Sequence, residues 1–344
     1  MYVPILKNWD SEMKALRMLK KAGILPCEGI VPFIKIVEED DAPTSRNWYK
    51  SIEKLNEFFA DKSAFVDYHR CNLEDYRQVD MGKIGRIREM SAEGEHYLEA
   101  LNKLADRENL IPVISIRSDV ENPSVETIIS HMEEYRRRHP GKPFCLSIDT
   151  NPENYSDIIE KMVETDYLFF DIGEKALPSQ RIQLMRLKNL EPEAQTVLLN
   201  SPRKRAIKNK EYETHGETDL IDNSVRTEYQ KLEFCGFGDF AGLRDDLKLN
   251  IKNGGFANAS IFIYRNDINK FHVYMNPDSS RKVMGLRDIS PLLQKDLPLL
   301  DPNGTCLALR QFREEWAKGN AGNFATWVTR TVVRYIQQIA ENPH

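Results

Sequence analysis

Acidic residues that could do chemistry close several short apolar runs of this 344-residue chain. Carboxylate oxygens are preferred ligands of Mg²⁺, Mn²⁺ and Ca²⁺, so such acids could hold a divalent cation if they meet in space. His69, in the stretch DYHRC, closes one of these runs and could act as a general acid or base. The candidate metal ligands are Asp67, Asp149, Asp171 and Asp239, and the candidate catalytic residues are Asp67, His69, Asp171 and Asp239.

Cationic and amide side chains follow the same runs. Arginine forks and lysines bind phosphate and carboxylate groups, so these residues could hold an anionic ligand while the acids keep them in place. The alternative is that acids and cations only pair with one another in a buried network without catalysis. The candidate ligand-binding residues are Lys35, Arg70, Arg117, Asn200, Arg203 and Arg265.

The runs themselves read as buried strands. They are apolar and rich in β-branched and aromatic residues, and segments with helical periodicity, such as TIISHMEEYRRRH and SQRIQLMRL, lie between most of them. YVPIL is predicted to be a first strand, and eight runs follow it. These are residues 30–37, 63–69, 110–117, 143–149, 166–173, 195–202, 234–240 and 259–265.

Eight strands that alternate with helices indicate a TIM-like (β/α)8 barrel of class α/β. Continuous apolar runs are typical of parallel strands covered on both faces. An open doubly wound sheet stays open as the alternative, although no GxGxxG turn follows the first strands. In a barrel, the residues at the strand ends would form one ring at the mouth, and Asp239 in FCGFGDFAGLR would belong to it.

The C-terminal part departs from this alternation. After residues 259–265, the stretch NDINKF predicts a turn into an antiparallel strand, HVYM, and His272 is assigned to that hairpin. Helical segments then close the chain. We expect residues 1–300 to form the barrel with a β-hairpin near 259–276, and residues 301–344 to form helices packed on it.

Composition excludes several classes of protein. The net charge is −5, so nucleic acid is not an expected partner, and the basic run 201–210 is interpreted as a solvated face. Five widely spaced cysteines without a CxxC pair favour a reducing, cytoplasmic environment. We expect neither a signal peptide nor a membrane anchor. GxSxG and HExxH motifs are missing, and Gly236 and Gly238 are explained by a strand that needs room beside a bulky neighbour.

Six stretches, in this order, resemble the phage beta-protein family, whose members occur in phages and bacteria. They are YVPILKNWDSEMKAL, GIVPFIKIVE, FFDIG, GFGDFAG, IFIYRNDINKFHVY and GNAGNFATWVTRTVVRYIQQI. The resemblance implies one globular unit, and Asp67, Asp171 and Asp239 match acids of the family's strand ends. Lys35 stands where family members often have an acid, and Arg334 and Tyr335 stand where they have a histidine pair, which puts a family-wide metal or acid–base site in doubt.

Two hypotheses follow. In the first, the chain acts in phage–bacterium conflict, as anti-phage defence or as a phage accessory protein, and recognises a protein partner or a phosphorylated small molecule at the barrel mouth. In the second, it is a metal-assisted phosphoester hydrolase that uses Mg²⁺ or Mn²⁺. The sequence assigns no cofactor outside this alternative.

Overall fold

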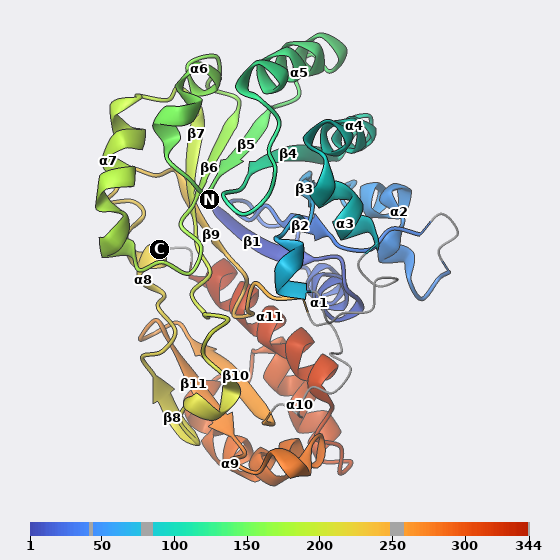
Figure 1. Ribbon diagram of the computed structural model, residues 1–344. Helices are drawn as coiled ribbons and strands as arrows, with labels where there is room; N and C mark the ends of the chain where they lie inside the picture. The colour runs from blue at the N-terminus through green and yellow to red at the C-terminus, as the bar shows by residue number, and fades with distance from the viewer. Residues whose placement is uncertain (41–43, 77–84, 248–257, 343–344) are drawn as a thin grey trace.

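The central feature is a closed barrel of eight parallel strands (Figure 1). The computed structural model describes residues 1–40, 44–76, 85–247 and 258–342. Neighbouring strands pair in sequence order, and β9 closes the barrel against β1 through the pairs Tyr2–Phe237 and Val3–Gly238. The predicted (β/α)8 barrel is confirmed. Its strands are β1 (Tyr2–Lys7), β2 (Phe33–Ile36), β3 (Ala64–Tyr68), β4 (Leu110–Ile116), β5 (Cys145–Ile148), β6 (Tyr167–Asp171), β7 (Gln195–Leu199) and β9 (Gly236–Asp239).

One strand of the predicted eight lies outside the barrel. The run 259–265 forms β10 (Ser260–Arg265) of a separate antiparallel sheet, and YVPIL supplies the missing barrel strand. The predicted hairpin is confirmed, because β10 pairs antiparallel with β11 (Lys270–Met275). A third strand, β8 (His215–Thr218), pairs with β11 and was not predicted from the sequence.

The small sheet is built from two insertions into the barrel. Strand β8 comes from the connection between β7 and β9, whereas β10 and β11 come after β9. Both insertions start at carboxyl ends of barrel strands, so the small sheet belongs to the loops that surround the mouth. Figure 1 shows this sheet and α9 (Met284–Leu300) below the barrel in that view.

Helices surround the barrel, and the last one closes it. Helix α11 (Phe324–Glu341) packs against α1 (Asp10–Lys21), where the eighth helix of a (β/α)8 barrel lies. Every helix in the described part of the chain is too short or too polar to cross a lipid bilayer. The others are α2 (Ile52–Phe58), α3 (Gly85–Ala92), α4 (Gly94–Ala105), α5 (Val125–Arg138), α6 (Ser156–Ile159), α7 (Arg181–Asn189), α8 (Ser224–Glu228) and α10 (Leu307–Trp316).

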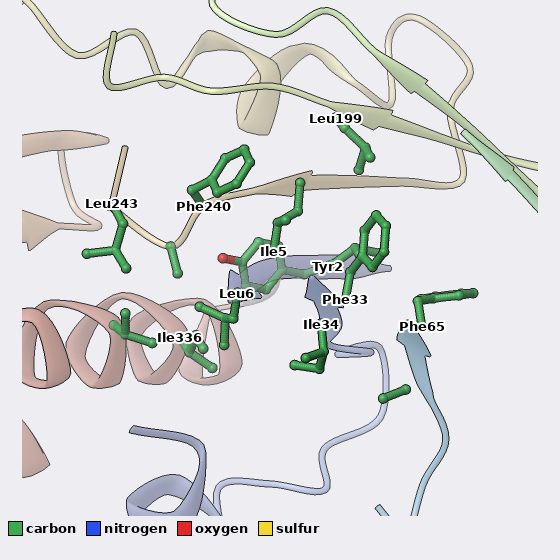
Figure 2. Close-up of a cluster of buried hydrophobic side chains, with 14 of the residues drawn as sticks. Tyr2, Ile5, Leu6, Phe33, Ile34, Phe65, Leu199, Phe240, Leu243 and Ile336 are labelled. Carbon is green, nitrogen blue, oxygen red and sulfur yellow. The ribbon is translucent and has the colours of Figure 1, made fainter. Parts of the chain in front are cut away.

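Aromatic rings fill the barrel interior. The Phe169 ring of β6 lies 5.7 Å from that of Phe33 and 4.8 Å from that of Phe65, although β6 is not a neighbour of β2 or β3. A Cβ on Gly238 would lie 2.5 Å from Leu199 Cδ2, so the prediction that this glycine provides room is confirmed. A second part of the same core lies between the barrel and α11, where Leu6, Leu243 and Ile336 gather (Figure 2).

Candidate functional site

Asp67 lies inside the mouth and is bonded on both oxygens. Lys35 Nζ lies 2.8 Å from Oδ2, and the Ser115 hydroxyl donates to the same oxygen at 2.7 Å. The Tyr97 hydroxyl donates to Oδ1 at 2.7 Å. Asp67 is buried and Lys35 is 12% exposed on its side chain. The structure therefore brings Lys35 and Asp67 together, but as partners of each other.

Tyr97 reaches this cluster from α4 because the barrel ladder is interrupted there. Pairing between β3 and β4 ends at Val66–Pro112, and proline has no amide proton to continue it. Beyond this point the Tyr97 hydroxyl accepts from the Ser115 amide at 2.9 Å and lies 3.1 Å from the Val113 carbonyl oxygen. Tyr97 thus fills the gap between the two strands, and sequence reasoning missed it because it lies in a helix.

A second cluster at the mouth centres on His69. Lys7 closes β1 and forms an ion pair with Asp245 at 3.1 Å, close to the buried histidine. Burial, together with the charges of Lys7, Arg117 and Lys35, lowers the pKa of His69 well below its usual value. The imidazole is therefore neutral at pH 7, as a general base or a hydrogen-bond acceptor must be.

The pKa of Asp245 is lowered as well. Burial alone would raise it, but the charges of Lys7 and Arg117 hold it far below the ordinary aspartate range. Sequence reasoning missed both members of the ion pair. Lys7 could have been found by position, because it ends the first strand and pairs with Lys35 of the second. Asp245 follows the eighth barrel strand in the stretch GLRDD.

Two predicted acids at the mouth have no side-chain cation in hydrogen-bond contact among the described residues. Asp149 accepts from the Ser118 amide at 2.7 Å, and Asp171 accepts from the Gly173 amide at 2.8 Å. Burial raises the pKa of each. The neighbouring Arg117 guanidinium instead donates two hydrogen bonds to Asp119, from Nε at 2.9 Å and from Nη2 at 3.1 Å.

Asp239 does not point into the mouth. Its neighbour two residues back, Phe237, packs on Tyr229 next to α8, outside the barrel, and strand alternation turns Asp239 to the same side. There it accepts from the hydroxyls of Tyr2 at 2.9 Å and Tyr335 at 2.5 Å. The expectation that Asp239 joins the ring is not met, because the alternation places Gly238 inward and the acid outward, under α11.

The four predicted metal ligands are not brought together. Within the described residues, Asp67, Asp149, Asp171 and Asp239 do not supply three ligand atoms close enough to share one ion. The reason is visible in their contacts, since Asp67 is saturated by Lys35, Ser115 and Tyr97, and Asp239 lies outside the barrel wall.

Three further predicted residues have structural contacts. Arg70 is buried, donates to the carbonyl oxygen of Ser115 at 3.2 Å and lies over the Tyr97 ring. Asn200 is buried. Its backbone amide donates to the Gly238 carbonyl oxygen at 3.0 Å, which extends the ladder between β7 and β9. Arg265 lies on β10 and pairs with Glu217 and Asp267, outside the barrel.

Arg203 lies in a cavity beside the mouth, formed by the segments that follow β7 and β9. The cavity has a volume of about 160 Å³. One water needs about 10–15 Å³ on the same measure, so there is room for a phosphate-sized group. Its lining comprises Arg203, Asn209, Leu243, Arg244, Asp246, Ser260, Phe262, Phe324, Trp327, Val328 and Thr331.

Two guanidinium groups converge on this cavity. Arg203 Nη2 and Arg244 Nη2 both donate to Asn209 Oδ1, at 3.2 and 3.3 Å. Burial, together with the charge of Arg244, lowers the pKa of Arg203 to about 10. The interpretation of residues 201–210 as a solvated face is therefore wrong for Arg203, which is only 8% exposed.

Arg203 is incompletely bonded. Its Nε has no hydrogen-bond partner among the described residues, and its Nη1 reaches the Gly242 carbonyl oxygen only at 3.5 Å. The Arg203 guanidinium lies over the Phe262 ring, with Cζ 3.5 Å from the ring centre. Asp246 also lines the cavity and lies 3.7 Å from Arg244 Nε. This arrangement can accept an anionic group.

Comparison with known proteins places the chain in a family. The family model described as Beta protein matches residues 2–278, which cover the barrel and the small sheet but not α9, α10 or α11. No curated protein and no solved structure matches the chain.

Proposed function

The chain belongs to the Beta protein family, and from the geometry beside its barrel mouth we propose that it recognises a small phosphorylated ligand as a component of phage–bacterium conflict. The observation that carries this proposal is Arg203, a buried guanidinium with an unpartnered nitrogen in a cavity that also holds Arg244. A buried guanidinium whose hydrogen-bond partners are all uncharged is costly, so its retention is explained if a ligand supplies an anionic acceptor.

The position of the cavity supports a phosphate in particular. In (β/α)8 barrels, phosphate groups often bind at the loops that follow strands seven and eight, and Arg203 and Arg244 come from these two loops. Arginine binds phosphate through two parallel hydrogen bonds from one guanidinium, and two guanidinium groups lie beside this cavity, joined through Asn209.

The rest of the ligand would face the mouth. Asp245, the partner of Lys7, stands between Arg244 and Asp246 in the chain, and both of these line the cavity. A ligand anchored by its phosphate can therefore extend toward the cluster around His69. Metal-assisted phosphoester hydrolysis has less support, because the four acids that it would need are not close together in the described residues.

The proposal is tested by calorimetry and thermal unfolding with inorganic phosphate, nucleotides and sugar phosphates. A ligand at about 100 times its dissociation constant should stabilise the wild type by roughly 2.7 kcal/mol. Arg203→Met should lose at least tenfold in affinity, whereas Arg334→Met, which changes a buried arginine outside the cavity lining, should bind like the wild type and is the control for a general loss of fold. Equal affinity of wild type and Arg203→Met for every ligand would refute the assignment.

The biological part needs a separate assay. Expression of the wild type in a bacterial host should change the plating efficiency of at least one phage in a panel, and Arg203→Met should abolish this change at equal protein level. If Arg203→Met changes the plating efficiency as much as the wild type does, the role in phage–bacterium conflict does not depend on the cavity.

A further inference from the structure

Two histidines and an aspartate meet on the small sheet. His215 lies on β8, His272 on β11 and Asp296 on α9, and one ligand atom from each lies within 4.8 Å of the other two. His215 Nε2 is 2.6 Å from Asp296 Oδ2, and His272 Nε2 is 3.9 Å from the same oxygen. This grouping joins segments that are 81 residues apart in the chain.

The sheet register places both imidazoles on one face. His215 pairs with Tyr274, and Glu217 pairs with His272, so the histidines are diagonal neighbours on adjacent antiparallel strands. Helix α9 packs against β10 and β11 and brings Asp296 to this face. The three side chains are therefore fixed by backbone pairing and helix packing.

His272 provides a second, independent observation. The residue is only 8% exposed, and neither ring nitrogen has a hydrogen-bond partner within the part of the chain that the structure describes. Buried polar groups are nearly always hydrogen-bonded, so a buried imidazole with both nitrogens unpartnered calls for an explanation. A metal ion bound to one of these nitrogens would give it a partner and would explain why it lacks a hydrogen bond.

We propose that His215, His272 and Asp296 bind a transition-metal ion of the Zn²⁺ class. Imidazole and carboxylate are established zinc ligands, and three protein ligands with one open position form a common zinc geometry. Ligand atoms of a tetrahedral zinc site lie about 3.3 Å apart, from metal–ligand distances near 2.0 Å. The observed 2.6 and 3.9 Å separations bracket this value, and the ion would replace the hydrogen bond between His215 Nε2 and Asp296 Oδ2.

The surroundings complete the site. Tyr274 donates its hydroxyl to Asp296 Oδ2 at 2.8 Å, which orients the carboxylate as outer-shell groups do in zinc sites. The His215 side chain is 40% exposed, so an ion can enter from solvent on that side. The site goes beyond the proposed ligand cavity and shares none of its lining residues.

The test uses the full chain, stripped with a chelator and titrated with Zn²⁺ alone in calorimetry and thermal unfolding. The wild type should bind one ion per chain and unfold at a higher temperature with Zn²⁺. His215→Ala and Asp296→Asn should each weaken binding at least tenfold and remove the thermal shift. Asparagine keeps an acceptor for Tyr274, and His215 is exposed, so both variants should fold.

The matched control is His96→Ala. His96 and Glu89 form an exposed pair at 2.8 Å in a different part of the molecule. This variant should bind Zn²⁺ like the wild type. The proposal is overturned if the wild type binds no Zn²⁺, or if His215→Ala and Asp296→Asn bind it as tightly as the wild type does. In that case His215 and Asp296 form an ordinary ion pair that holds α9 to the sheet.

Discussion

Asp239, at the end of β9, and Arg203, in the segment after β7, are both buried ionisable residues, yet their surroundings differ in kind. Asp239 accepts three hydrogen bonds, from Tyr2, Tyr335 and the Ala241 amide. Arg203 keeps one nitrogen without any partner in the described residues, in a cavity with room for a ligand. The difference separates a charge that holds the fold together from one that is available for binding.

Asp239→Ala tests whether the hydrogen bonds of Asp239 stabilise the fold. The substitution leaves two buried hydroxyls and one buried amide without an acceptor, at about 1–3 kcal/mol each, so the free energy of unfolding should fall by at least about 3 kcal/mol. Urea denaturation measures this loss. Asp171→Ala is the comparison, because Asp171 has one backbone amide as its hydrogen-bond partner and should lose less. If Asp239→Ala is as stable as the wild type, the contacts with α11 are not stabilising.

For Arg203 we predict that substitution causes little or no loss of stability. Arg203→Met removes a buried charge that has no ion-pair partner within 4 Å in the described residues, so the free energy of unfolding should stay within about 1 kcal/mol of the wild type or rise. Arg334→Met is the matched control, because this buried arginine donates to the carbonyl oxygens of Tyr264 and Leu300. Loss of those bonds should cost about 1–3 kcal/mol. A larger loss in Arg203→Met than in Arg334→Met would make Arg203 structural.

The cluster around His69 adds a prediction about how the free energy of unfolding changes with pH. The pKa of His69 is lowered in the fold by burial and by Lys7, Arg117 and Lys35, so the unfolded chain takes up a proton first as the pH falls. Stability contributed by the neutral ring is present above about pH 6.5 and is lost progressively below it, by at most about 1.4 kcal/mol per pH unit. His69→Gln should flatten the slope of unfolding free energy between pH 7 and 5. An unchanged slope would show that other groups dominate it.

The barrel could be predicted because its strands carry a strong local signal. Which runs belong to the barrel was harder to predict. Residues 259–265 have the apolar composition of a barrel strand, and only their antiparallel pairing distinguishes them from one. Strand β8 could not be predicted, because HGET has one buried residue, Thr218, and is held by pairing with β11 alone. Register between distant segments is not encoded in local periodicity.

The direction of a side chain at a strand end was the main difficulty for the site. Asp67 and Asp239 look alike in the sequence, but one faces the mouth and the other faces α11. The signal was present for Asp239, because glycine at 238 marks the inward position and the next residue must then point outward. Arg203 offered no such signal, since a run of basic residues does not show which one is buried.

The last prediction concerns Arg265, the predicted ligand residue that the structure places outside the barrel. It pairs with Glu217 and Asp267, whose side chains are 42% and 62% exposed, so Arg265→Met should cost no more than about 1 kcal/mol. Ser260, which lines the cavity, lies five residues away on the same strand, or about 17 Å at 3.3 Å per residue. Affinity for a phosphorylated ligand, measured by calorimetry, should therefore match the wild type. A loss as large as that of Arg203→Met would mean that the ligand extends along β10 and that binding involves the small sheet as well as the cavity.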